Sequence, residues 1–67
     1  MTNIKILDEK MKAKGINDKV LSDALGISVS TWYRRKLAPN QITIGEAIII
    51  TETLNLSMQE ASEIFLQ

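Results

Sequence analysis

Apolar residues recur along the chain at helical spacing, and no segment alternates apolar and polar residues long enough to predict a β-strand. The first helix is expected over residues 3–14, because three apolar side chains share one of its faces: Ile4, Leu7 and Met11. Gly15 follows as a residue that can take the left-handed conformation, so we expect the helix to end there.

Two short helices are expected next, over residues 18–25 and 29–36, with a tight turn between them. Asn17 and Ser28 are suitable caps for their first turns, and Gly26 ends the earlier helix. The apolar side chains expected to pack inside are Leu21, Leu25 and Trp32.

Two capping boxes, each a Ser or Thr followed three residues later by Glu, predict the starts of two C-terminal helices. The box at 43–46 opens a helix over 44–54, and the box at 57–60 opens a helix over 58–66. A loop with a Pro-Asn turn precedes them at 37–42. On the first of these two helices, the residues expected to share one apolar side are Ile44, Ala47, Ile48 and Leu54.

The sequence therefore predicts an all-α fold, a compact five-helix bundle that forms a single domain over residues 1–67. No Cys and no His occur, which removes disulfides, the usual zinc ligands and a histidine general base. We therefore expect no metal, no cofactor, no small-molecule substrate and no enzymatic activity. The longest apolar run, residues 47–50, is far shorter than a membrane span, and no apolar signal region follows Met1, so we expect a cytoplasmic protein without a membrane partner.

Charge is divided unevenly although the net charge is zero. Residues 1–42 hold eight Lys and Arg against four Asp and Glu, a balance of +4, and residues 43–67 hold four Glu and no cation, a balance of −4. Such a split is expected if one face meets phosphate and the other meets solvent or a partner. The same pattern also fits helices that simply carry solvated charged faces.

Residues 15–36 read GINDKVLSDALGISVSTWYRRK and have the layout of a helix-turn-helix. That motif needs a small residue where its two helices cross closely, and Ser22 is such a residue. It also needs a glycine in the turn, here Gly26, and apolar side chains that lock the helices together, of which Trp32 is the largest. The second helix ends in three basic residues, so it is suited to enter the DNA major groove.

With this motif and the tail TIGEAIIITETLNLSMQEASEIF, the chain resembles the lambda-repressor-like helix-turn-helix domains of phage Cro and repressor proteins and the wider xenobiotic-response-element group. The resemblance extends from about Ile4 to Phe65, and the tail is most similar to small Cro-like regulators from phages of Gram-positive bacteria. It implies a DNA-binding transcriptional regulator whose recognition helix begins near Ser28. Its partner is then a double-stranded operator with inverted repeats, which would associate the protein with the nucleoid.

The chain departs from the family pattern at Asp18. The family usually has glutamine at this position, where it braces a phosphate and the recognition helix. A carboxylate facing phosphate is repulsive, so the resemblance leaves this contact to Asn17 or Lys19 instead.

Arg34 is the first candidate for reading a base, because arginine donating twice to guanine is the commonest specific contact. A phosphate contact or a solvated charge is the alternative. Val29 and Ser30 lie in the first turn of the recognition helix, where a thymine methyl and a polar base edge are the matching partners. Val29 can also be exposed without any such role.

Other side chains of this region are expected to contact the phosphate-sugar backbone or to cap the helix, while Trp32 is expected in the core. The stem of Arg35 is expected to cover the edge of the core while its charged end reaches the backbone. The complete DNA-contacting set that we predict is Asn17, Lys19, Ser28, Val29, Ser30, Thr31, Tyr33, Arg34, Arg35, Lys36 and Asn40.

The two C-terminal helices carry more apolar residues than one small core needs, because a helix cannot turn three consecutive isoleucines (48–50) inward. Part of helices 44–54 and 58–66 is therefore a candidate homodimer contact, and ordinary exposed apolar residues are the alternative. A dimer would match the two half-sites that repressors of this type read, roughly 34 Å apart.

A second functional class stays open, because a fold does not determine a function. The zero net charge and the aspartate at position 18 are also compatible with a protein-interaction module on the same fold, such as an anti-repressor or an antitoxin-like partner.

Overall fold

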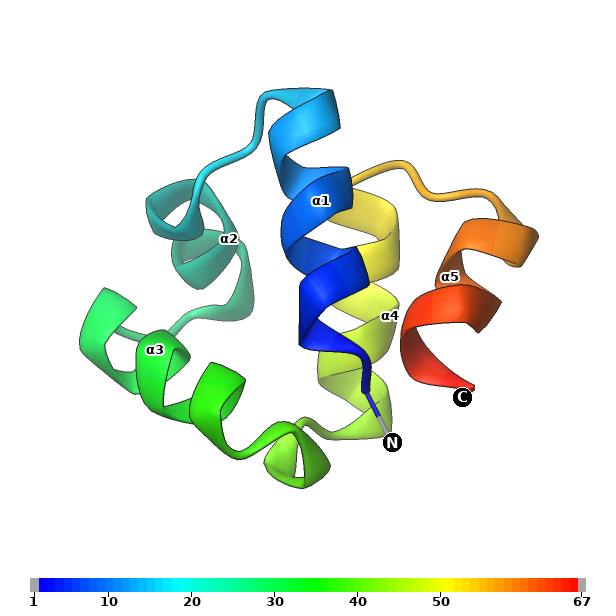
Figure 1. Cartoon of the computed structure of the whole chain (residues 1–67). Helices are drawn as coiled ribbons and strands as arrows, with labels where there is room; N and C mark the ends of the chain where they lie inside the picture. The colour runs from blue at the N-terminus through cyan, green and yellow to red at the C-terminus, as the bar shows by residue number, and fades with distance from the viewer. Residues whose placement is uncertain (1, 67) are drawn as a thin grey trace.

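Five α-helices and one short 3₁₀ turn account for most of residues 2–66, the part of the chain that the computed structural model describes (Figure 1). The helices are α1 (Ile4–Lys14), α2 (Asp18–Leu25), α3 (Val29–Leu37), α4 (Ile44–Thr53) and α5 (Met58–Phe65), with the 3₁₀ turn at Pro39–Gln41. No strand occurs within residues 2–66, and the predicted all-α fold of five helices is confirmed. Of the predicted domain 1–67, the two terminal residues lie outside the described part.

Local hydrogen bonds decide where each helix begins. The side-chain oxygen of the capping residue accepts from the backbone N–H three residues later, and the caps are Asn3, Asn17, Ser28, Thr43 and Ser57. Gly15 and Gly26 follow α1 and α2 with φ of 70° and 72°, a conformation that disfavours any side chain with a Cβ. The predicted boundaries are therefore confirmed to within one residue; α1 begins and α3 ends one residue later than expected, and α4 and α5 each end one residue earlier.

Side chains from all five helices meet in one core. Its buried apolar members are Leu7, Met11, Leu21, Trp32, Ile50, Leu54, Leu56 and Ile64. α1 and α4 lie at the centre of the molecule, α2 and α3 flank them on one side and α5 on the other (Figure 1). Ser22 is fully buried, and its hydroxyl donates to the Lys19 carbonyl 2.9 Å away, so this small residue leaves no polar group unpaired.

The buried side of α4 differs from the expected one. Ile50 and Leu54 are buried, whereas Ile44 is 83% exposed and Ile48 is 54% exposed, so the prediction was wrong for these two isoleucines. Ile44 and Ile48 are spaced four apart and share a side of the helix, and so do Ile50 and Leu54. Both stripes are apolar, and only the packing of the other helices selects which of them faces the core.

A pair of salt bridges joins α1 to α5 at Glu60. Its carboxylate oxygens lie 3.2 Å from Lys10 Nζ and 3.5 Å from Lys14 Nζ, and one oxygen also accepts from the Ser57 backbone N–H in the capping box. The hydrogen bond from Ser57 and then that from Lys10 lower the pKa of Glu60 to about 2. A single carboxylate therefore caps one helix and holds it to another.

No helix within residues 2–66 has the length and the apolar composition needed to cross a membrane.

Acid is expected to weaken the fold through Glu60. Because its folded-state pKa of about 2 lies below the ordinary value of 4.5, the stabilisation is present above about pH 5 and is lost as the pH falls toward 2. Melting temperatures measured across this range should fall less steeply for Glu60→Gln, which keeps the hydrogen bond from Ser57, than for the wild type. Glu63→Gln, which removes a carboxylate outside any ion pair within residues 2–66, is the control. Equal slopes for all three proteins would contradict this role of Glu60.

Candidate nucleic-acid interface

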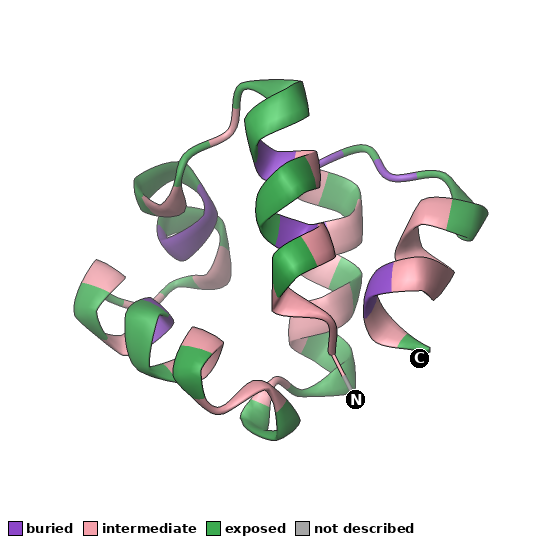
Figure 2. Cartoon of the chain, viewed as in Figure 1, coloured by how far each residue is buried: buried purple, intermediate pink, exposed green. Residues whose placement is uncertain are grey.

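α3 follows α2 after a turn of three residues, and it has one buried and one exposed side (Figure 2). Trp32, 1% exposed, is its buried anchor. The exposed side carries Ser30, Tyr33, Arg34 and Leu37. Ser30 and Arg34, two of the three side chains that the sequence predicts as readers of DNA bases, therefore lie on the exposed side of a helix whose opposite side is inside the core.

Asp18 ties α2 to this helix. Its Oδ1 accepts from the Trp32 indole N–H at 2.7 Å and from Lys36 Nζ at 3.0 Å. Lys36 Nζ also lies 2.8 Å from a carboxylate oxygen of Asp8 on α1. Asp18 thus satisfies the single donor of a buried indole, and this structural role explains a carboxylate at the position where the family resemblance leads one to expect glutamine.

Lys36 is held between these two carboxylates, and its side chain is only 15% exposed. Burial alone lowers the pKa of a lysine, but the hydrogen bonds from Lys36 to Asp8 and Asp18 outweigh burial and raise its pKa above the ordinary 10.5. Lys36 thus has a structural role inside the protein, with its charge held between two opposite charges, and its phosphate contact stays a prediction.

Arg35 is engaged in the same way, through an ion pair that joins α3 to α4. Its guanidinium donates to the carboxylate of Glu46, whose other oxygen accepts from the Thr43 backbone N–H. Burial raises the pKa of Glu46, and the hydrogen bonds from Thr43 and Arg35 outweigh it, so the pKa lies below its usual value. The charged end of Arg35, which we expected on the DNA backbone, thus fastens α3, the predicted recognition helix, to α4.

Intramolecular pairing therefore uses much of the uneven charge seen in the sequence. Lys10 and Lys14 pair with Glu60, and Arg35 pairs with Glu46, so cations of the first 42 residues meet anions of the last 25. Lys19 pairs with Asp23 at 2.7 Å on the surface of α2, where both side chains stay largely exposed. Such an exposed pair contributes little to stability, so Lys19 remains able to exchange its partner for a phosphate.

Arg34 is the one cation of α3 that makes no ion pair within residues 2–66; elsewhere in that range Lys5 and Lys12 also make none. It is exposed, and its Nη2 donates to Thr31 Oγ1 at 3.1 Å. Of the basic cluster that ends the predicted recognition helix, only Arg34 therefore points its charge outward.

The remaining predicted contacts divide into caps and exposed side chains. Asn17 and Ser28 are helix caps, and their side-chain oxygens accept hydrogen bonds from backbone N–H groups. Ser30 and Asn40 are exposed, Tyr33 is half exposed, and Val29 and Thr31 are partly buried. Most of these residues lie on α3 or cap its start; Asn40 lies in the 3₁₀ turn after it, and Asn17 caps α2.

The sequence interpretation missed Leu37, which is 87% exposed at the last position of α3. It lies four residues after Tyr33, so the two share the exposed side of the helix. The four-residue spacing is visible in the sequence, but the Pro-Asn turn signal predicts a loop that already begins at Leu37.

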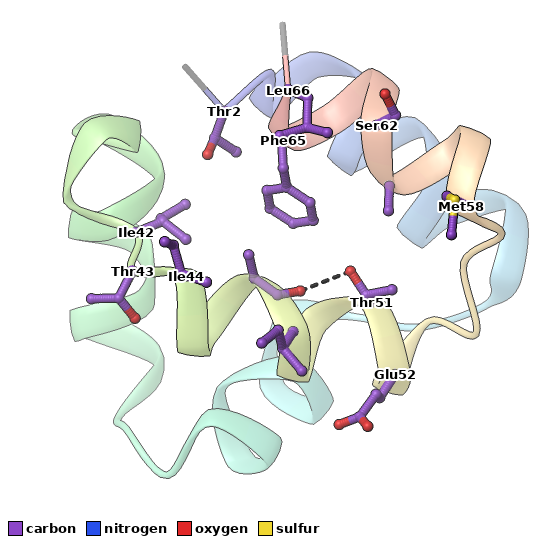
Figure 3. A pocket seen from close by; sticks show the side chains of 13 residues that line it. Thr2, Ile42, Thr43, Ile44, Thr51, Glu52, Met58, Ser62, Phe65 and Leu66 are labelled. Atoms are coloured by element: carbon purple, nitrogen blue, oxygen red, sulfur yellow. Dashed lines mark hydrogen bonds between the residues drawn. The ribbon is translucent and has the colours of Figure 1, made fainter.

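A second surface feature lies between α4 and α5 (Figure 3). It is an open groove of about 570 Å³ whose apolar lining includes Ile44, Ile48, Met58, Phe65 and Leu66. The ring of Phe65 points into it, and the one charged side chain in the lining, Glu52, points away from that ring (Figure 3). The isoleucines that proved exposed on α4 therefore form one wall of a groove rather than isolated apolar spots.

Comparison of the chain with models of protein families, with curated proteins and with solved structures found no match. Within residues 2–66 no group of three or more Asp or Glu side chains could hold a metal ion. The geometry of α3 and of the groove therefore carries the functional argument.

Removing the Asp18 carboxylate should destabilise the fold. Asp18→Ala leaves the buried Trp32 indole N–H without an acceptor, and we expect a loss of about 1–3 kcal/mol in the free energy of unfolding. Asp18→Asn keeps an oxygen that can accept from the indole and removes only the charge that faces Lys36. It should therefore lower the free energy of unfolding by less. Urea unfolding measures both.

Asp23→Ala is the matched control, because it removes an aspartate of the same helix from an exposed ion pair. Its effect should stay within about 0.5 kcal/mol. Equal losses for Asp18→Ala and Asp23→Ala would show that the indole does not depend on Asp18.

Proposed function

We propose that the protein is a sequence-specific DNA-binding transcriptional regulator, a Cro-like member of the lambda-repressor-like helix-turn-helix class. In this proposal α2 and α3 form the helix-turn-helix, and α3 enters the major groove of an operator. The observation that supports it best is the division of α3: Trp32 and Arg35 fix the helix from inside, while Ser30, Tyr33 and Arg34 stay exposed.

Side chains of α3 and of the 3₁₀ turn after it then have specific parts. Arg34 donates to a guanine edge, Ser30 contacts a polar base edge, and Val29 meets a thymine methyl in the first turn. Tyr33 and Asn40 contact the phosphate-sugar backbone, which positions the helix without reading sequence.

In this proposal, the electrostatic attraction between the protein and the DNA phosphates is modest. Arg34, Lys5 and Lys12 are the cations without an ion pair in the described part of the chain, and Lys19 can be recruited from its exposed pair. Each neutralised phosphate contributes about −0.9 to the slope of log affinity against log salt. We therefore expect the log affinity of a single copy to fall only slowly as log salt rises. Tight binding is expected to need a second copy of the protein. Binding to an operator would hold the protein at the nucleoid in the cytoplasm.

A second copy of the chain is the proposed occupant of the α4–α5 groove. The surface is suited to a self-complementary contact, because Ile44 and Met58 protrude beside the hollow into which Phe65 points. Burying Ile44 and Met58 of both copies, at about 1.5–3 kcal/mol for each of the four side chains, contributes about 6–12 kcal/mol, and association costs about 4–15 kcal/mol. The two magnitudes are similar, so the dimer is expected to be weak without DNA.

One observation favours a different function, a protein-interaction module of the anti-repressor or antitoxin type. Leu37 and Tyr33 expose apolar surface on α3, where most of the neighbouring cations are already paired. That surface suits a protein partner better than it suits phosphate. Failure to bind any DNA would leave this module as the better proposal.

The direct test of DNA binding is a selection from random duplexes at low salt, followed by affinity measurements on the enriched sequence. Arg34→Ala should cost about 1–3 kcal/mol on that sequence and relax discrimination at one base pair. Lys12→Ala, which removes an unpaired cation from α1, should weaken all sequences alike or leave them unchanged. No enriched duplex would contradict DNA binding, and equal losses from Arg34→Ala on all sequences would make Arg34 a phosphate contact.

The proposed dimer predicts a concentration-dependent mass in the absence of DNA. Sedimentation equilibrium at several concentrations should detect self-association of the wild type, and Ile44→Glu should abolish it by placing a charge in the groove. Leu37→Glu is the matched control, because it adds the same charge at an equally exposed position outside the groove. A wild type that stays monomeric, or equal effects of both variants, would contradict a dimer through this surface.

A further inference from the structure

A chain of side-chain hydrogen bonds follows one side of α3 at three-residue intervals. Ser28 Oγ donates to Thr31 Oγ1 at 3.0 Å and itself accepts from the Thr31 backbone N–H at 3.1 Å. Arg34 Nη2 then donates to the same Thr31 Oγ1 at 3.1 Å. The Thr31 hydroxyl oxygen is therefore an acceptor shared by the helix cap and the exposed guanidinium.

We propose that Thr31 is a positioning residue that holds Arg34 in the orientation needed to read guanine, without itself contacting a base. This inference rests on the proposed DNA binding and adds the residue that controls specificity at that site. It replaces the sequence expectation that Thr31 contacts the phosphate-sugar backbone.

The geometry supports this role because of where the hydrogen bond pulls the guanidinium. Long side chains on a helix lean toward its N-terminus, and the bond to Thr31 fixes Arg34 in that direction, toward the first turn of α3. The first turn is the part of a recognition helix that contacts base edges. Thr31 thus holds the charge at the level of the first turn of α3, on the side of the helix that Thr31 and Arg34 share.

The donors needed for recognition remain available. A guanidinium has five N–H groups, and the bond to Thr31 uses one of them. The others can still form the two parallel hydrogen bonds that a guanine O6 and N7 accept. The bond to Thr31 is therefore compatible with base reading.

Pre-orientation affects specificity because an exposed arginine otherwise samples many rotamers. Thr31 is partly buried and belongs to the capped first turn, so it is a fixed point, whereas Arg34 is exposed. An arginine held in one direction loses less freedom on binding guanine and is less able to reach a neighbouring phosphate instead. Thr31 is thus expected to act on discrimination between bases more than on general affinity.

The first experiment needs no DNA. Side-chain ¹⁵N relaxation of Arg34 Nε in the free protein should report a more ordered guanidinium in the wild type and in Thr31→Ser than in Thr31→Val. Valine has nearly the shape of threonine and keeps the backbone N–H that donates to Ser28 Oγ, so the capping hydrogen bond stays and Ser28 loses only the acceptor of its exposed hydroxyl. An Arg34 Nε that is equally mobile in all three proteins would overturn the proposal whatever the DNA result.

The second experiment measures the affinity of the three proteins for the enriched duplex and for the same duplex with adenine replacing the guanine read by Arg34. Thr31→Val should lose about fivefold in the ratio of the two affinities, the change expected from one lost hydrogen bond, and Thr31→Ser should restore it. A folded Thr31→Val with unchanged discrimination, beside an Arg34→Ala that has lost it, would overturn the role of Thr31 and leave DNA binding standing. If the wild type enriches no duplex, the proposed function fails, and the role of Thr31 in specificity fails with it.

Discussion

The hydrogen bond from the Trp32 indole to the Asp18 carboxylate is the contact on which the orientation of α3 depends. Trp32 is the largest buried side chain, and its indole N–H needs an acceptor inside the fold. Asp18 meets that need from the first residue of α2 and binds Lys36 with the same oxygen. One carboxylate therefore joins α2 to α3 through the indole and pairs with a mostly buried cation of α3.

The same network limits how the surface can function. Lys36 and Arg35 are used to fasten α3 to α1, α2 and α4, so the helix exposes little charge. In the proposed binding to DNA, specific contacts from a few side chains then matter more than general attraction to phosphate. Such a balance would suit the proposed regulator, which needs its correct operator, better than a protein that coats DNA non-specifically, and the paired cations also suit a protein partner for α3.

Features that depend on neighbours in sequence were predictable, and features that depend on distant residues were not. Caps such as Ser28 act over three residues, so a single sequence reveals them. Trp32 was correctly expected in the core, but its acceptor lies fourteen residues earlier in the chain, and Arg35 finds Glu46 eleven residues later. The prediction of the apolar side of α4 was wrong for a related reason. Ile44 and Ile50 are equally apolar, and only tertiary packing decides which of their faces is buried.

The central claim is that the exposed side of α3 reads DNA while the opposite side is fixed to the core. An NMR titration of the ¹⁵N-labelled protein with the enriched duplex tests it most directly, because every backbone amide reports separately. The account predicts that the largest shifts occur at Ser30, Tyr33 and Arg34 and that Trp32 keeps its indole signal. Shifts confined to the α4–α5 groove, or no shifts along α3 on saturation, would contradict it.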